Sequence, residues 1–378
     1  MKILTNTRFA QTAGIAQVVL SFIDFIEKRK GKNLNIVAVN IETLKPNQKN
    51  SFKKVSGKKK STLTFGVHIP SDVVKNAKNL DEVAEKYEEI IFAYQTAIKK
   101  EKPDLILING TYFMPWCLLL ASERENIPVT VHYHGVLSKE VKNWDKKSRK
   151  IFLDMEKSFD KKGIFYIFPS KITKSVVERE VFKHKIKNSA IIQNPVPNYF
   201  FEEENLADKI NVGIVSRWAQ VKNVRFCEEF ANYNQKKGNK FVINIITDLN
   251  ENSEIYKRLS KSVKFHKPKS NKNLASFYKN MGVLISPSHF ETYGNVAKEA
   301  LASGTPAIVN PNMGVSETFD LLGLKDWVAD FGSVKSIYDK IESVIGKTVD
   351  NGVRNKMKEL YVPEIIFEQL ITTLTTSI

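Results

Sequence analysis

Short apolar runs alternate with longer amphipathic stretches from the first residues of the chain onward. In the first half, strands are expected at residues 2–6, 35–40, 105–108, 129–133 and 164–168. Helices are expected between them, at residues 16–29, 81–100 and 171–182. This alternation is typical of βαβ units around a parallel sheet, so the first half predicts a Rossmann-like architecture.

The same alternation restarts in the second half after a break in the pattern. Asn194-Pro195-Val196-Pro197 and an acidic, aromatic stretch at residues 200–205 indicate a linker near residues 197–209. Strands are expected at residues 212–216, 241–247, 283–286 and 307–310. We therefore predict one Rossmann-like domain at residues 1–200 and another at 201–355, with residues 356–378 as a C-terminal helix able to cross back to the first domain.

Composition fits two soluble α/β domains. With 378 residues the chain exceeds what one hydrophobic core normally supports, and 42% of its residues are hydrophobic and 26% charged. No apolar run reaches the roughly 18 to 20 residues of a membrane span. The N-terminus lacks the features of a signal peptide, and the two cysteines, Cys117 and Cys227, fall in different predicted domains. These features favour a reducing cytoplasmic location.

A formal charge of +17 is large enough to attract phosphates, an anionic membrane or nucleic acid. The lysines are densest at residues 49–60, inside a segment rich in Ser, Asn and Gly. This segment is either a solvated loop or a contact with the inner face of a membrane or an anionic acceptor. Charge alone does not choose between them.

The most informative stretch is residues 286–306, where a buried strand is expected to end in a polar turn before an Ala/Leu-rich helix. Gly294 permits close backbone approach, and the first amides of the helix, at Asn295 and Val296, lack intrahelical partners. They form a ready site for a diphosphate. Glu291 before the helix and Glu299 inside it are able to accept hydrogen bonds from sugar hydroxyls. Taken alone, Glu299 also fits an ordinary surface position.

Four further residues are candidates because they follow predicted strands. Arg217 and Lys222 follow a strand of the second half, so both cations can converge on one diphosphate. In the first half, His134 follows a strand and precedes a glycine, with His132 as the alternative or as a structural histidine. Gly14 opens a helix after the first strand and can approach a phosphate or sugar, although a plain turn fits it as well.

These stretches together resemble the retaining glycosyltransferases of family 4. In that resemblance Glu291 contacts the donor sugar and Glu299 holds the nucleotide ribose. Arg217 and Lys222 neutralise the departing diphosphate, and His134 contacts the donor sugar at the edge of the cleft. Weaker resemblances involve the family's strand-end serine, its Asn-Gly-Val segment and its Gly-Gly-x-x-Glu segment, here Ser170, Asn194 to Val196, and Gly314 to Glu317. The resemblance implies that Glu317 starts a helix near the donor and belongs to the donor-binding residues. Departures from the family pattern are Ala13, Pro195 and Trp218.

The resemblance implies an α/β GT-B fold, with two Rossmann-like doubly wound domains facing across a cleft. It implies a retaining hexosyltransferase that takes a nucleotide-diphosphate sugar, with UDP or GDP expected, and passes the sugar to a glycan or a lipid-linked acceptor. No cofactor and no metal are expected, because the sequence has no Asp-x-Asp motif and no Cys/His cluster. Nucleic acid is not an expected partner. The alternatives are a GT-B epimerase or phosphorylase, and a catalytically silent GT-B module that binds an anionic polymer.

Overall fold

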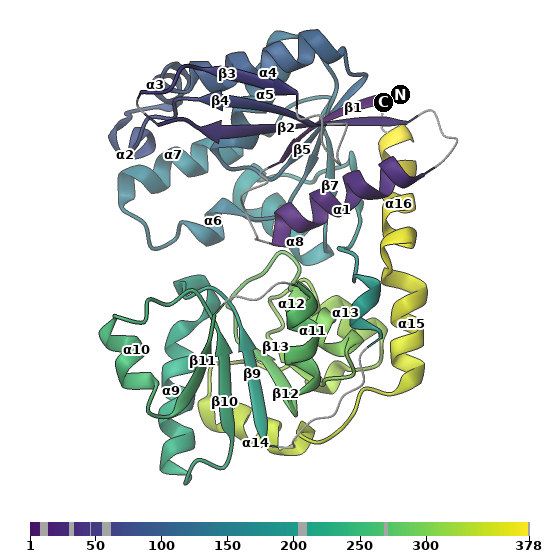
Figure 1. Ribbon diagram of the computed structural model, residues 1–378. Coiled ribbons are helices and arrows are strands. Elements are labelled where there is room, and N and C mark those ends of the chain that lie inside the picture. Colours follow the sequence, from purple (N-terminus) through teal and green to yellow (C-terminus); the bar gives the residue numbers. More distant parts are fainter. Residues whose placement is uncertain are drawn as a thin grey trace. The chain divides into compact units, whose positions relative to one another are not determined.

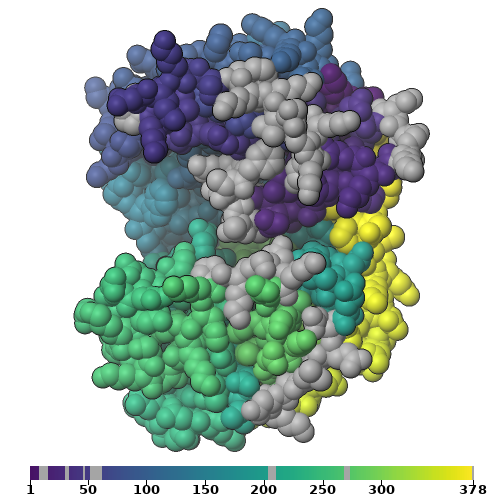
Figure 2. All heavy atoms as spheres, in the orientation of Figure 1, coloured from purple at the N-terminus to yellow at the C-terminus, as the bar shows by residue number. Residues whose placement is uncertain are grey.

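Parallel strands and connecting helices make up most of the structure, as the alternating pattern predicts (Figure 1). The computed structural model describes residues 1–7, 14–29, 34–45, 47–54, 62–202, 210–267 and 271–376. The chain divides into two units. The first comprises Met1–Pro169, Thr173–Ile192 and Phe367–Ile378, and the second comprises Ser170–Ile172 and Gln193–Ile366. The space-filling view shows one face of the structure, coloured along the sequence (Figure 2).

The first unit is built on a sheet with strand order β3-β4-β2-β1-β5-β6-β7-β8. All paired strands run parallel except β3, which pairs antiparallel with β4. The strands are β1 (Lys2–Thr7), β2 (Asn35–Thr43), β3 (Ser51–Lys54), β4 (Thr62–Val67), β5 (Leu105–Asn109), β6 (Val129–His132), β7 (Phe165–Phe168) and β8 (Ser189–Ile191). The strands β5 and β6 are buried along their length and β2 is buried except at its ends, which explains why they read as continuous apolar runs.

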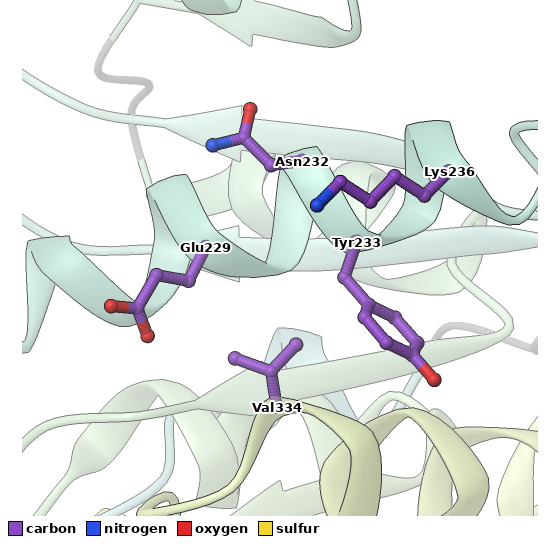
Figure 3. Close-up of a pocket in the computed structure, with 5 residues that line it drawn as sticks. All are labelled: Glu229, Asn232, Tyr233, Lys236 and Val334. Atoms are coloured by element: carbon purple, nitrogen blue, oxygen red, sulfur yellow. The ribbon is translucent and has the colours of Figure 1, made fainter.

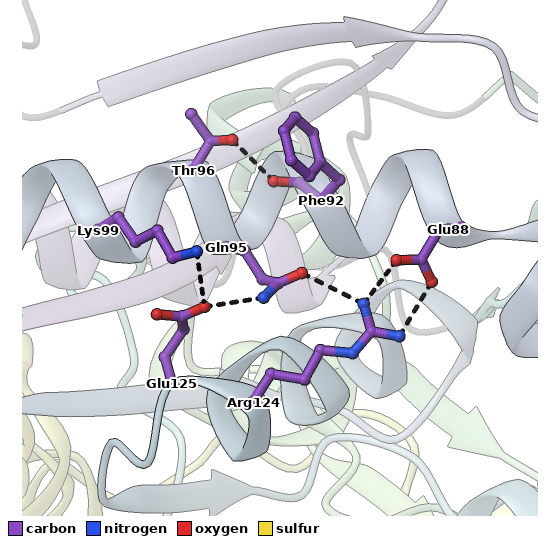
Figure 4. A network of polar contacts seen from close by, with 7 residues as sticks. All are labelled: Glu88, Phe92, Gln95, Thr96, Lys99, Arg124 and Glu125. Carbon is purple, nitrogen blue, oxygen red and sulfur yellow. Dashed lines mark hydrogen bonds and ion pairs between the residues drawn. The ribbon is translucent and has the colours of Figure 1, made fainter.

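Helices connect these strands through the crossovers that parallel pairing requires. They are α1 (Gly14–Lys28), α2 (Val73–Asn76), α3 (Leu80–Lys86), α4 (Glu88–Glu101), α5 (Phe113–Arg124), α6 (Leu137–Glu140), α7 (Lys146–Lys157), α8 (Lys171–Val176) and the π-helical turn η1 (Val177–Phe182). Exposed polar side chains join α4 to α5: Arg124 binds both carboxylate oxygens of Glu88 at 2.6 and 2.9 Å, and Gln95 links Arg124 to Glu125 (Figure 4).

The last helix, α16 (Pro363–Thr376), passes from one unit to the other. Its Phe367 ring lies 5.3 Å from the ring of Phe22 in α1, and Arg29 forms a 2.5 Å ion pair with Glu368. The C-terminal residues from Phe367 therefore belong to the first unit, beside α1 (Figure 1).

The second unit has a fully parallel sheet with strand order β11-β10-β9-β12-β13. Its strands are β9 (Asn211–Val215), β10 (Val242–Ile246), β11 (Val263–His266), β12 (Val283–Ser286) and β13 (Ala307–Val309). Its helices are η2 (Asn198–Phe200), η3 (Gln220–Lys222), α9 (Val224–Lys236), α10 (Glu254–Leu259), α11 (Asn271–Lys279), α12 (Asn295–Ala302), α13 (Ser316–Leu321), η4 (Lys325–Trp327), α14 (Val334–Val344) and α15 (Asn351–Tyr361).

Several sequence-based expectations need correction. The units divide between Ile192 and Gln193 rather than at residue 200, with the short segment Ser170–Ile172 in the second unit. The helix expected at residues 81–100 is interrupted at Tyr87, where α3 ends and α4 begins. The lysine-rich segment is not simply a loop, because residues 51–54 form β3; residues 55–61 lie outside the described residues.

Candidate functional site

In the second unit, the structure brings Lys222 and Glu291 into direct contact. Lys222 ends η3, shortly after β9, and its Nζ lies 2.8 Å from Oε1 of Glu291. The Ser288 hydroxyl donates to the same oxygen at 2.8 Å. Lys222 and Glu291 are only 16% and 22% exposed, so water screens this ion pair less than a surface pair. Two motifs that are far apart in the sequence thus meet at the carboxyl edge of one sheet.

The backbone around Glu291 is fixed by a second segment of the same unit. The Gly314 amide donates to the Glu291 carbonyl at 3.0 Å, and the Val315 amide donates to the Tyr293 carbonyl at 2.5 Å. A Cβ on Gly314 would collide with the Thr292 carbonyl oxygen. The glycine of the predicted Gly-x-x-Glu segment is therefore needed for close approach of the two backbones.

Helix α12 begins where the sequence predicts. Gly294 is its N-cap and has a φ of +105°, a conformation that glycine adopts without strain. A Cβ there would also lie 2.8 Å from the side chain of Met313. The amides of Asn295 and Val296 lie in the first helical turn, where backbone N–H groups lack intrahelical acceptors. This turn is suited to an anionic group.

Glu299 lies inside α12 beside a hydroxyl that the sequence did not reveal. The Tyr278 hydroxyl donates to Oε2 of Glu299 at 3.1 Å. Burial raises the pKa of the Glu299 carboxyl to about 7, while the Tyr278 hydrogen bond and the Lys298 charge oppose the rise. Glu299 therefore differs from an ordinary surface glutamate.

Lys298 is a fully buried cation next to Glu299, and it was not a sequence-based candidate. Its Nζ donates to the Asn194 carbonyl and to the Tyr293 hydroxyl, and it lies 4.0 Å from the ring centre of Tyr361. Burial lowers the pKa of the Lys298 amine well below its ordinary value. Its position one turn before the buried Leu301 was the available signal, because that spacing places both on the same helix face.

The other candidates of the second unit have different surroundings. Arg217 is exposed on the turn after β9, and its carbonyl accepts from the Ala219 amide at 3.0 Å. Both carboxylate oxygens of Glu317 accept from backbone amides, those of Lys171 at 3.1 Å and Ile172 at 2.7 Å. Glu317 therefore binds the backbone of the short segment Ser170–Ile172, which belongs to the same unit, a structural use that the sequence did not indicate.

In the first unit, His134 belongs to a buried polar network at the carboxyl ends of β1, β5 and β6. Its Nε2 lies 3.1 Å from Oδ1 of Asn109. The Asn109 amide nitrogen donates to Thr5 Oγ1 at 2.7 Å, and the Asn109 backbone amide donates to Asn6 Oδ1 at 2.8 Å. These bonds orient the Asn109 side chain with its oxygen toward the imidazole, so Nε2 of His134 carries the proton in that bond.

Burial determines the charge state of both candidate histidines. It lowers the pKa of His134 to about 4, and it lowers the pKa of His132 well below its ordinary value, with the nearby His134 adding to the shift. The two rings lie 4.1 Å apart. At neutral pH both are therefore uncharged, and His134 acts through hydrogen bonds rather than through positive charge.

The loop after His134 is held by a buried carboxylate that the sequence did not single out. Glu156 of α7 accepts from the amides of Leu137 and Ser138, at 3.0 and 3.2 Å, and from the Thr111 hydroxyl at 3.3 Å. Burial raises the pKa of Glu156 to about 7. Its partners come from two segments outside α7, so no local motif reveals it.

Gly14, the remaining candidate, is the first residue of α1. The turn before it, including Thr12 and Ala13, lies outside the described residues.

Cys117 and Cys227 are free, buried and in different units. Across the described ranges, no group of three or more His, Cys, Asp or Glu side chains is placed to hold a metal ion. Within the same ranges, every helix is too short or too polar to cross a membrane.

One cavity, of about 300 Å³, lies away from all these candidates. It is open to solvent between α9 and α14, and its lining side chains come mostly from the outer face of α9 (Figure 3): Glu229, Asn232, Tyr233, Lys236 and Val334. It contains none of the predicted site residues. A second cavity, of about 240 Å³, lies in the first unit between α2, α5 and α7.

Comparisons with known proteins agree with the fold of both units. The sucrose-phosphate synthase of Thermosynechococcus elongatus superposes with a TM-score of 0.74 at 15% identity, covering 99% of this chain and 98% of that one. The lipopolysaccharide outer core galactosyltransferase WaaB gives 0.66 at 14% identity, covering 100% of both chains. At such identities the likeness shows the fold alone, two Rossmann-like α/β units of the GT-B type.

Sequence comparisons match parts of the chain. A 100-residue stretch is 33% identical to the capsular polysaccharide biosynthesis glycosyltransferase CapM of Staphylococcus aureus, covering 25% of this chain and 26% of that relative. The matched part is thus about a quarter of that relative's length. Residues 196–359 match the family model described as Glycosyl transferases group 1. This matched stretch lies entirely within the second unit, in the segment Gln193–Ile366.

Proposed function

We propose that the protein is a retaining glycosyltransferase of family 4, moving a hexose-type sugar from a nucleotide-diphosphate sugar to a glycan or lipid-linked acceptor. The observation that carries the proposal is the 2.8 Å contact between Lys222 and Glu291, because it joins two separate motifs beside the first turn of α12. A cation, a carboxylate and unpaired helix amides then face the parts of a donor that bear phosphate and sugar hydroxyls.

The charges in this site suit the departure of a nucleotide diphosphate. As the bond to the sugar breaks, negative charge develops on the diphosphate, and a preorganised cation stabilises it. We assign this role to Lys222, Arg217 and the first-turn amides of α12. Glu291 keeps Lys222 in place and is positioned to orient the sugar, while Glu299 holds the ribose. Because these cations supply the positive charge, we propose transfer without a metal ion.

The first unit then binds the acceptor and contributes His134. A neutral imidazole, held by Asn109, offers hydrogen bonds to a sugar hydroxyl without carrying a charge. We propose a cytoplasmic location. In a variant of this proposal, the lysine-rich residues 49–60 contact the cytoplasmic face of an anionic membrane. Co-sedimentation with anionic vesicles tests this contact.

Nucleotide binding is the first experiment. Thermal melting with UDP, GDP, ADP and their sugars should show a higher melting temperature for one base, since a ligand at 100 times its Kd stabilises the native state by about 2.7 kcal/mol. Release of that nucleotide with a sugar acceptor, and sugar transfer onto the acceptor, then separates a transferase from an epimerase. Absence of any nucleotide effect, together with salt-dependent polymer binding, would favour a catalytically silent module.

A further inference from the structure

The 240 Å³ cavity of the first unit lies at the functional edge of its sheet. Three connections that follow strands β4, β5 and β6 line it: Asp72 and Lys75 come from the first, Tyr112 from the second, and Trp144 from the third. Ligands of open α/β sheets bind outside the carboxyl ends of the strands, where such connections begin. The cavity therefore lies where a ligand of this unit is expected.

Two exposed aromatic side chains give the cavity an apolar wall. Tyr112 is 39% exposed and Trp144 is 47% exposed. Both rest on the buried ring of Phe152, which stacks on Tyr112 with ring centres 4.9 Å apart and meets Trp144 edge-on at 5.2 Å. Because Phe152 holds them from behind, their outer faces are presented to solvent in a defined orientation.

The surrounding helices keep this wall in place. Asp145 caps α7 by accepting from the Ser148 amide at 2.9 Å, one residue after Trp144. Lys147 Nζ donates to the Asn76 carbonyl at 2.7 Å and so ties α7 to α2. The aromatic faces thus belong to a connected group of helices rather than to a single side chain.

The polar groups of the lining suit a sugar better than an apolar chain. A pyranose ring has a C–H face, which packs on an aromatic ring, and an edge of hydroxyls. The carboxylate of Asp72, the ammonium of Lys75 and the hydroxyl of Ser148 supply acceptors and donors for such an edge. The volume is below the roughly 300–1,000 Å³ of sites that enclose a drug-sized ligand, which fits one ring rather than a whole oligosaccharide.

We propose that this cavity is a saccharide subsite, in which one pyranose ring of the acceptor stacks on Trp144 and Tyr112. The inference rests on the proposed transferase function. It adds that the acceptor is a carbohydrate, with at least one pyranose ring that this cavity binds. It adds an aromatic platform to the first unit, distinct from the His134 network.

Ligand-detected NMR on the full chain tests the subsite. The probes are the methyl glycosides of glucose, galactose, mannose and N-acetylglucosamine, observed by saturation transfer. We expect at least one glycoside to bind, and Trp144→Ala or Tyr112→Ala to weaken that binding about tenfold, as loss of an aromatic contact would. Phe92→Ala is the matched control, because Phe92 is a 66% exposed aromatic residue of the same unit that does not line the cavity.

Other results would overturn the subsite. Wild-type protein that binds none of the glycosides, or binding that is equal in the variants and the wild type, would do so. If Trp144 fluorescence changed with anionic phosphatidylglycerol vesicles and did not change with glycosides, the aromatic wall of the cavity would be a membrane contact instead. Nucleotide-induced melting shifts are measured on the same variants: if those shifts persist, the subsite alone has failed, and if the wild type lacks them, the transferase proposal has failed.

Discussion

The two units arrange polar side chains at the carboxyl edges of their sheets in opposite ways. In the first, His134 and Asn109 form a buried network, and burial keeps the imidazole uncharged at neutral pH. In the second, Lys222 and Glu291 form a charged pair that is still partly accessible. In the proposed function, the charged pair receives the diphosphate, and the directional hydrogen bonds of the first unit recognise uncharged hydroxyls.

The largest effect is expected for the charged Lys222–Glu291 pair of the second unit. Lys222→Ala should lower turnover, because it removes the preorganised positive charge that stabilises the leaving diphosphate. We expect the activation free energy of sugar transfer to rise by about 2 to 4 kcal/mol. Steady-state kinetics with the nucleotide identified by melting measures it. Lys257→Ala, a change at an exposed lysine of the same unit, is the control and should leave kinetics unchanged. Wild-type turnover in Lys222→Ala would remove Lys222 from the donor site.

An effect of comparable size, on stability rather than turnover, is expected for the buried carboxyl group of Glu156 in the first unit. Burial raises the pKa of Glu156 to about 7 from 4.5, so the folded protein holds this proton more tightly than the unfolded chain. The contribution of Glu156 to stability is therefore full below pH 4.5 and is lost as pH rises to about 7, by roughly 3 kcal/mol in total.

Glu156→Gln should remove that pH dependence, because glutamine keeps acceptor and donor groups but does not titrate. Urea unfolding of the wild type and the variant at pH 5 and pH 8 measures the difference. Glu299→Gln is the parallel variant in the second unit, where burial also raises the pKa to about 7. An unchanged pH slope in Glu156→Gln would show that the Glu156 carboxyl titrates normally in the folded state.

How far the sequence reaches also differs between the units. The motif from Ser286 to Pro306 predicted the strand, the turn at Gly294 and helix α12, because its contacts are local. The central strands were likewise predictable from their apolar runs. Asn109 and Glu156 were not predicted, because their partners lie on other elements of the first unit. Lys298 was not predicted either, because one of its partners, the Asn194 carbonyl, is far away in the sequence. The strand β3 was hidden by its lysines, which are tolerated at the edge of a sheet.

The two glutamates of the α12 motif should separate donor orientation from nucleotide binding. Glu291→Gln should lower turnover by raising the activation free energy by about 1 to 2 kcal/mol, since it weakens the ion pair with Lys222 and the proposed hydrogen bonds to the sugar. Glu299→Gln should instead weaken the affinity for the free nucleotide. Turnover and nucleotide affinity are measured for both variants. Exchanged effects would reverse the two roles, and unchanged values in both would assign them to ordinary structural positions.

A smaller change sharpens the account of His134. Asn109→Asp keeps an oxygen toward Nε2 but adds a negative charge, so the pKa of His134 should rise from about 4 by about one unit or more. NMR titration of the imidazole nitrogens reports this directly, and the wild type should show a proton on Nε2. A wild-type proton on Nδ1 would contradict the orientation of Asn109 that its bonds to Thr5 and Asn6 indicate.

The smallest expected effect concerns metal ions, and it tests whether the second unit supplies enough positive charge by itself. In the proposed mechanism, Lys222, Arg217 and the first-turn amides of α12 supply the positive charge that a divalent cation would otherwise bring to a diphosphate. Excess EDTA should therefore leave sugar transfer within about twofold of its original rate. The same assay with Lys222→Ala adds a control, because magnesium should partly restore turnover only when the protein's own cation is missing. Loss of wild-type activity in EDTA, with recovery on adding magnesium or manganese, would show that a metal ion rather than Lys222 carries the charge.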